Sequence, residues 1–381
     1  MLFYTINNLL ILVWAAIFCW HKPSKVKNLI FVIVAFAQLF AVMVFRHGIG
    51  YDYNMYAVGY NFMTQDGFSN LTYKDWEIGF VLLTKVLGMF LPNYMWYMGI
   101  FSLVAIIPAA IFIYRDSEIP WLSTVLYINL FVFFMSMNFI RQMIAISFVM
   151  LAWHFLKRNK FIPYAIIILV ASLFHQTVLI MIPVYLLVKM KPNFKELIVY
   201  AYLLLWFYIS STGFIEIITT FFHEEYSGSA FLTEGLSFVY VILPLFVTVA
   251  AFLLVKVGTI NVTNENKYLI NLSLIATLMM LTMARHSIIE RLSYYFLFFI
   301  VLLVPLIYRS LRTKGISYTI SETKSINLTT DRQKFALALV FVLIVLALSY
   351  FHFYYGLTEK AHGVVPYDTW LRTSWSGLLS N

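Results

Sequence analysis

Long apolar runs bounded by polar or basic residues recur from one end of the chain to the other. A helix needs about 20 apolar residues to cross a bilayer, and most of these runs come close to that length. Nothing between them has the pattern of a separable soluble module, so we predict a single all-α transmembrane domain over residues 1–381. The ten expected spans are 2–20, 28–45, 93–114, 121–137, 138–156, 196–212, 237–256, 268–284, 289–308 and 335–355.

Two apolar stretches do not fit simple spans. Residues 161–188 lie between two basic connections that both favour the inner side, and 28 residues are too few for two crossings of about 20 residues each. We therefore expect a re-entrant or broken-helix hairpin. Residues 77–91 would reach only about 21 Å as a helix, which predicts a short half-helix dipping in from outside. Irregular backbone at membrane depth is tolerated where protein or a wet cavity surrounds it, so both elements are expected to line a cavity.

The distribution of charge sets the expected orientation. The predicted inner connections hold 18 of the 26 Lys and Arg residues, whereas the outer segments hold 11 of the 17 Asp and Glu residues. Because basic residues concentrate on the cytoplasmic side, this bias favours an outer N-terminus in a multi-pass membrane protein. The expected loops are two outer ones at 46–76 and 211–236, a flexible inner one at 309–334, and an outer tail at 356–381.

Composition narrows the function classes. The chain is 62% hydrophobic and 11% charged, and its net charge is +9. The basic surplus faces the anionic inner leaflet in this topology, so nucleic acid is not expected as a partner. The single cysteine, Cys19, excludes an intramolecular disulfide and a thiol metal cluster. No nucleotide-binding, dinucleotide-binding or zinc-protease motif is present, and we expect neither a cofactor nor a metal.

Four cationic or potentially cationic side chains fall at one expected depth. Arg141 lies 16 residues before Lys157, about 24 Å above the inner surface at helical rise. The same arithmetic gives about 21–22 Å for His175 and about 27 Å for Arg285 and Arg291. Ionisable groups at such depth usually line a polar path or site, although each could instead snorkel or pair at the interface. The four are Arg141, His175, Arg285 and Arg291.

Two carboxylates face this level from the outer side. Asp52 stands among aromatic residues of the loop 46–76, and Glu77 stands at the mouth of the short helix. Together with the cations they are consistent with an outward-facing cavity in which arginines hold an anion and a histidine or carboxylate handles a proton. The tyrosines around Asp52 could stack on sugar faces or form an ordinary interfacial belt.

Several short motifs resemble one family when they are taken in order. The motifs Gly50-Tyr51-Asp52-Tyr53, Glu77-Ile78-Gly79-Phe80, Asn138-Phe139-Ile140-Arg141-Gln142 and Phe174-His175-Gln176-Thr177 resemble the EpsG family of bacterial exopolysaccharide and O-antigen (Wzy-type) polymerases. Tyr56, Arg291 with Tyr294 and Tyr295, and Pro366-Tyr367 continue the resemblance over most of the chain.

The resemblance implies a glycosyltransferase with a GT-C-like architecture that builds exopolysaccharide or lipopolysaccharide glycans. Such enzymes transfer a growing glycan from undecaprenyl pyrophosphate to the terminal sugar hydroxyl of another lipid-linked repeat unit at the periplasmic face. The expected partners are therefore undecaprenyl-pyrophosphate-linked oligosaccharides, membrane lipids and possible chain-length regulators. No metal is required by this chemistry.

The candidate roles follow from the resemblance and from the chemistry of each side chain. Arg141 and Arg291, with Arg285 third, are expected to bind the pyrophosphate, because guanidinium groups stabilise charge that develops on it. His175 is the first choice for the general base, Glu77 is the second, and Asp52 could instead orient acceptor hydroxyls. The glycan-binding candidates are Tyr51, Tyr53, Tyr56, Gln142, Gln176 and Tyr294.

Three alternatives remain open at this point. An O-antigen ligase or another lipid-linked glycan transferase would share the donor chemistry and differ in the acceptor. A lipid-glycan flippase or a transporter would also use broken helices. A membrane-bound O-acyltransferase would also use a histidine within the membrane.

Overall fold

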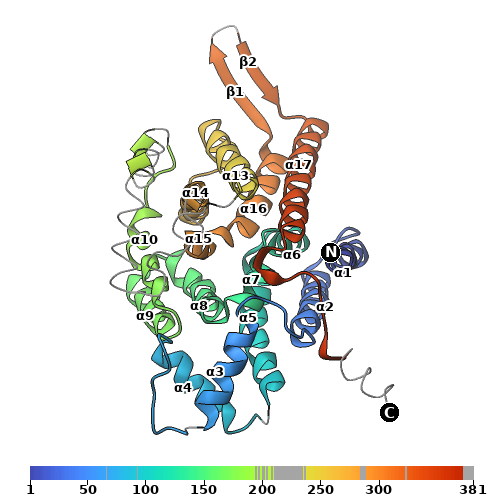
Figure 1. Cartoon of the computed structure of the whole chain (residues 1–381). Coiled ribbons are helices and arrows are strands. Elements are labelled where there is room, and N and C mark those ends of the chain that lie inside the picture. Colours follow the sequence, from blue (N-terminus) through green and yellow to red (C-terminus); the bar gives the residue numbers. More distant parts are fainter. Residues whose placement is uncertain are drawn as a thin grey trace. The chain divides into compact units, whose positions relative to one another are not determined.

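A computed structural model describes residues 1–371 with gaps at 66, 92, 194, 196–197, 200–201, 203–204, 207–208, 210–234, 236, 284–288 and 322–323. The chain divides into two compact units. The first comprises residues 1–182 together with the C-terminal segment from Phe353, and the second comprises residues 183–352. Each unit is built from helices, and one short β-hairpin belongs to the second (Figure 1).

The first unit contains the helices that carry most of the candidate residues. They are α1 (Leu2–Phe18), α2 (Lys25–Val44), α3 (Tyr53–Gln65), α4 (Ile78–Gly88), α5 (Tyr94–Asp116), α6 (Pro120–Asn129), α7 (Val132–Asn138), α8 (Ile140–Leu156), α9 (Phe161–Ser172) and the 3-10 helix η1 (Gln176–Ile180). Helix α8 packs against α5 and α9, and α3 packs beside α4. The core between these elements is rich in aromatic rings, among them Tyr56, Trp76, Phe80, Tyr97 and Phe101.

The remaining elements continue from the end of the first unit through the second. They are α10 (Met181–Leu187), α13 (Val239–Lys256), α14 (Asn264–Met283), α15 (Ile289–Leu297), α16 (Ile300–Lys314), β1 (Ile316–Ser321), β2 (Lys324–Leu328), α17 (Asp331–Thr358) and η3 (Ala361–Gly363). The last of them, the end of α17 and η3, belong to the C-terminal segment of the first unit. In the second unit α14 packs against α13, α15 and α16.

The all-α polytopic class predicted from the sequence is confirmed, but the expected number of spans is not. Among the described residues, α2, α5, α13 and α17 are each long and apolar enough to cross a membrane. The bent pairs α6–α7 (52°) and α15–α16 (41°) raise the number to six if each pair is one span. Helices α1 and α8 have 17 residues each, fewer than the apolar runs from which spans were expected. Most of the expected span 196–212 and of the outer loop 211–236 lies outside the described residues.

The two irregular apolar stretches are broken or short helices, as their lengths required. Residues 161–188 form α9, then a break, then η1 and α10. The break lies at residues 173–175, where His175 adopts an extended conformation (φ −162°, ψ 112°). Helix α4 has only 11 residues, so a short helix is present where the half-helix was expected at 77–91.

Residues 309–334, where a flexible inner loop was expected, contain regular structure in the part that is described. Helix α16 continues to Lys314, β1 and β2 pair as an antiparallel hairpin, and α17 begins at Asp331. The register pairs Ile316 with Leu328 and Tyr318 with Ile326, which gathers the apolar side chains on one face. This alternation of apolar and polar residues is the ordinary strand signal, and the polar composition of the segment had obscured it.

Candidate functional site

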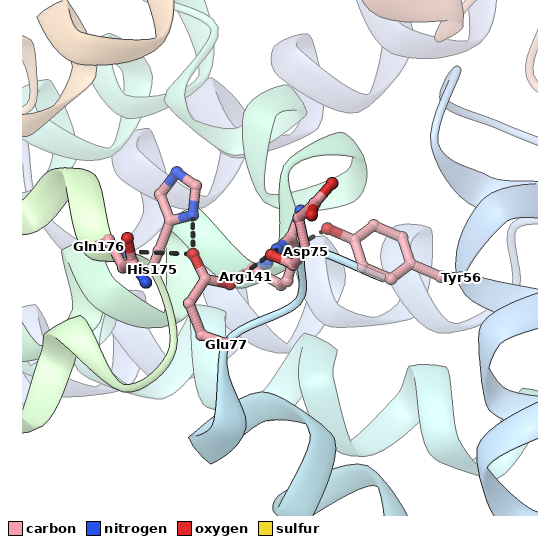
Figure 2. Close-up of polar contacts among 6 residues, drawn as sticks. All are labelled: Tyr56, Asp75, Glu77, Arg141, His175 and Gln176. Atoms are coloured by element: carbon pink, nitrogen blue, oxygen red, sulfur yellow. Dashed lines mark hydrogen bonds and ion pairs between the residues drawn. The ribbon is translucent and has the colours of Figure 1, made fainter. Parts of the chain in front are cut away.

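The centre of the site is the buried carboxylate of Glu77, whose side chain is 5% exposed. Its Oε1 accepts hydrogen bonds from His175 Nδ1 at 2.9 Å and from the Gln176 backbone N–H at 3.1 Å. Its Oε2 accepts a hydrogen bond from Arg141 Nη1 at 2.6 Å, which is also an ion pair. Figure 2 shows the three side chains converging from three separate elements. We call Glu77, Arg141 and His175 the carboxylate triad.

Glu77 reaches its partners because α4 docks closely on the break after α9. Glu77 precedes the first residue of α4, and its side chain does not cap that helix. The Gly79 N–H donates to the Leu173 carbonyl at 2.9 Å. A Cβ at residue 79 would lie 2.6 Å from that same oxygen, so this approach of the two backbones requires glycine.

His175 and Gln176 are presented by the break itself. The extended backbone of His175 ends the helical hydrogen bonding of α9, and Gln176 then begins η1. The first N–H groups of a helix have no partner within it, and here the Gln176 N–H is satisfied by Glu77. The same carboxylate thus orients the imidazole and caps the helix that follows.

Arg141 enters the site from the first turn of α8. The chain leaves helical geometry at Phe139 (φ −92°, ψ 64°) between α7 and α8. The Arg141 backbone N–H donates to Tyr56 Oη at 3.4 Å, and Nη1 also donates to the Asp75 carbonyl at 3.4 Å. The guanidinium carbon lies 5.3 Å from the centre of the Trp76 ring, a cation–π contact.

The environment keeps Glu77 ionised. Burial alone would raise the pKa of Glu77, but the hydrogen bond from His175 and the charge of Arg141 outweigh it and lower the pKa to about 2. A carboxylate with so low a pKa is a poor proton acceptor at neutral pH. Glu77 is therefore better suited to holding the His175 imidazole than to acting as a base itself.

The contact with Glu77 also assigns the tautomer of His175. An ionised carboxylate accepts only from a ring nitrogen that carries hydrogen, so Nδ1 carries hydrogen, and Nε2 is the basic nitrogen when the imidazole is neutral. Figure 2 shows Nε2 on the side of the ring turned away from Glu77. The side chains of His175 and Arg141 are 14% and 19% exposed, whereas that of Glu77 is 5% exposed.

Some predicted residues adjoin the triad, and others have different surroundings. Tyr56 contacts Arg141 and Gln176 contacts Glu77 through its backbone. Asp52 stands one turn before Tyr56 and is fixed by its N–H, which donates to Asn138 Oδ1. Tyr51 is 71% exposed and its hydroxyl donates to the Lys360 carbonyl.

Two further glycan candidates of the first unit are buried. The Tyr53 carbonyl accepts a hydrogen bond from the Tyr94 hydroxyl. Gln142 follows Arg141 on α8 and is 3% exposed. Neither contacts the Glu77 carboxylate among the hydrogen bonds of the described residues, so their glycan-binding roles stay predictions.

The later candidates belong to the second unit. Arg291 and Tyr294 lie on α15, and Tyr294 Oη donates to Glu290 Oε1 at 3.3 Å. Arg291 is partly buried. Arg285 lies outside the described residues. The convergence of Arg291 and Arg285 with the triad therefore stays a prediction.

Sequence reasoning did not assign a role to Trp76 or Gly79. Trp76 adjoins Glu77 in the sequence and packs against Arg141, and Gly79 allows the close docking of α4. The available signal for Gly79 was its place in the Glu77-Ile78-Gly79-Phe80 motif.

These observations define a multi-pass membrane protein whose buried carboxylate joins an arginine and a histidine from distant helices. The EpsG family model matches residues 29–321, and this chain belongs to the EpsG family. The match includes every member of the carboxylate triad. Comparisons with curated proteins and with solved structures gave no match. The family assignment supports a polysaccharide polymerase type of function.

Proposed function

We propose that this protein is a polymerase that transfers a growing glycan from undecaprenyl pyrophosphate to the terminal sugar hydroxyl of a lipid-linked repeat unit. The reaction takes place at the outer face of the inner membrane. The observation that carries the proposal is that Glu77 bonds a histidine and an arginine at the same time. Membership of the EpsG family supports the same conclusion.

His175 is the general base in this proposal. Its Nε2 takes the proton of the acceptor hydroxyl as that oxygen attacks the anomeric carbon of the donor. The bond from the anomeric carbon to the diphosphate oxygen breaks, and lipid pyrophosphate leaves with the bonding electrons. Glu77 holds the imidazole in orientation and stabilises the imidazolium that forms, as carboxylates do in other histidine bases.

The charge of the triad changes in step with the reaction. With neutral His175, the charges of Glu77 and Arg141 sum to zero. When His175 takes the proton, the triad becomes net positive while negative charge develops on the leaving diphosphate. An interaction that is stronger in the transition state than in the ground state accelerates the reaction, whereas an interaction of equal strength in both states does not.

Further residues are proposed to bind the substrates. Arg141, Arg291 and Arg285 bind the diphosphate, and Asp52 orients acceptor hydroxyls. The proposed fold is GT-C-like with about ten spans, and the enzyme needs neither cofactor nor metal. A chain-length regulator is the proposed protein partner. The glycan contacts come from Tyr51, Tyr53, Tyr56, Gln142, Gln176 and Tyr294.

The test is incubation of the purified protein in nanodiscs with a synthetic lipid-pyrophosphate oligosaccharide. A ladder of products separated by one repeat unit is the expected result. A single transfer to a different acceptor without a ladder would indicate a ligase, and movement of intact lipid-linked glycan would indicate a flippase. A thioester-dependent acylation would indicate an acyltransferase. Any of these three outcomes would overturn the proposal.

A further inference from the structure

Arg46 is a buried cation whose partners are backbone carbonyls. It follows Phe45, the C-cap residue of α2, and is 3% exposed. Its Nη1 donates to the Met43 carbonyl at 2.7 Å, and its Nη2 donates to the Met137 carbonyl at 3.2 Å. In the part of the chain that the structure describes, Arg46 forms no ion pair with a carboxylate.

The two carbonyls belong to the ends of two helices. Met43 lies in the last turn of α2 and Met137 in the last turn of α7. The final carbonyls of a helix have no partner within it, and a helix C-terminus carries roughly half of a negative charge. Two such ends together supply about one negative charge, which compensates the buried guanidinium without a carboxylate.

The end of α7 is also where the chain turns towards Arg141. Helix α7 ends at Asn138, and α8 begins two residues later with Arg141 in its first turn. The Asn138 side chain accepts the Asp52 N–H at 3.0 Å. A Cβ on Gly50 would lie 3.1 Å from the Met137 carbonyl. The segment 46–52 therefore packs closely against the break between α7 and α8.

We infer that Arg46 is a positioning residue for Arg141. By tying the end of α7 to the end of α2, it fixes the direction in which α8 starts and so directs the Arg141 side chain to Glu77. This inference rests on the proposed function for the importance of Arg141 to turnover. Its structural part, the immobilisation of the α7–α8 break, stands on the contacts alone.

The chain offers a matched control in Tyr367. Its hydroxyl donates to the Val42 carbonyl at 3.1 Å, in the same last turn of α2. No hydrogen bond of the Tyr367 side chain to α7 occurs among the described residues. Arg46→Met and Tyr367→Phe therefore both remove a hydrogen bond from the end of α2, but only Arg46→Met also releases the end of α7.

The experiment compares amide hydrogen exchange and turnover in the full-length protein in nanodiscs. We expect Arg46→Met to speed exchange across residues 139–143 by about tenfold or more, because a charged hydrogen bond to the break is lost. Tyr367→Phe should change exchange there by less than about twofold. Arg46→Lys, which presents one compact charge in place of a two-pronged donor, should fall between the two.

Turnover per folded molecule provides the second readout. We expect about a tenfold loss for Arg46→Met and less than about twofold for Tyr367→Phe. In an Arg141→Gln background, Arg46→Met should cost no further turnover, since residues that act through one another are not additive. A purely structural arginine would lower yield and thermal stability but leave the rate of the folded molecules unchanged.

The outcomes separate the inference from the proposed function. If the wild type makes no polymer, the proposed function fails, and the exchange comparison alone decides whether Arg46 holds the break. Equal exchange at 139–143 in Arg46→Met and Tyr367→Phe would overturn the inference. So would normal turnover of Arg46→Met in an active wild-type background. If Arg46→Met does not fold, Arg46→Lys is subjected to the same two comparisons.

Discussion

Substitution of Gly79 by alanine tests the geometry of the site with one added methyl group. The new Cβ would lie 2.6 Å from the Leu173 carbonyl oxygen and 2.7 Å from Leu173 Cβ. The first of these neighbours is backbone, so it cannot rotate away. Ordinary contact begins at 3.4 Å, and α4 must therefore move about 0.8 Å from the break after α9 to relieve this contact.

That movement is enough to break the hydrogen bond on which the account depends. The Glu77–His175 distance is 2.9 Å, and an added 0.8 Å would bring it to about 3.7 Å, beyond hydrogen-bonding range. Glu77 would then no longer hold the imidazole. We expect turnover to fall by about 10²-fold, the typical cost of misplacing a catalytic group by about 1 Å.

The assay is polymer formation per folded molecule in nanodiscs, with thermal stability measured in parallel. Gly99→Ala is the matched control, because Gly99 lies within α5 and its new Cβ would meet only the end of the Val44 side chain at 3.3 Å. We expect the control to keep wild-type turnover. If Gly79→Ala polymerises at the wild-type rate, close docking of α4 is not needed and the reasoning is refuted.

Three further predictions concern the carboxylate triad itself. Glu77→Gln and His175→Ala should each lower turnover by about 10²-fold or more, and the double variant should be little worse than His175→Ala alone; additive losses would show that the two residues act separately. Arg141→Lys should lower turnover at least about tenfold, because a single ammonium cannot reproduce the contacts of the guanidinium with both Glu77 and the substrate diphosphate. Full activity of Arg141→Lys in a repeat-unit assay would exclude diphosphate binding as the role of Arg141. The folded-state pKa of Glu77 is lowered from 4.5 to about 2, so its stabilisation is fully present above about pH 4.5 and is lost as the pH falls through about 2. The difference in thermal unfolding between wild type and Glu77→Gln should therefore be largest at pH 6 and shrink steadily as the pH falls from about 4.5 towards 2, and a constant difference would contradict this assignment.

The sequence predicted the broken elements because length and charge left no other solution. Residues 161–188 could not cross the membrane twice, and the structure breaks the helix at 173–175 beside His175. The depth argument likewise brought out Arg141 and His175, since an ionisable group in an apolar helix needs a partner. Glu77 was placed at the mouth of α4, which is where the structure has it.

Other features left no readable signal in the sequence. The bend between α6 and α7 occurs at Phe131, which adopts φ 63° without glycine or proline to mark it. The break at Phe131 lies inside one expected span, 121–137, because hydropathy alone extended that helix across it, whereas the break at Phe139 lies next to the expected boundary between the spans 121–137 and 138–156. No role for Arg46 was apparent from the sequence, because its partners are backbone carbonyls, one in the preceding helix and one in a helix 91 residues further along the chain.

The central claim is tested most directly by release of lipid pyrophosphate from a synthetic lipid-linked repeat unit. The measurement compares wild type with His175→Ala at saturating substrate, in nanodiscs, with the folded fraction of each determined independently. The account predicts steady release by the wild type and a rate at least about 10²-fold lower for His175→Ala. Equal rates for the two proteins would contradict the claim that His175, held by Glu77, is the base.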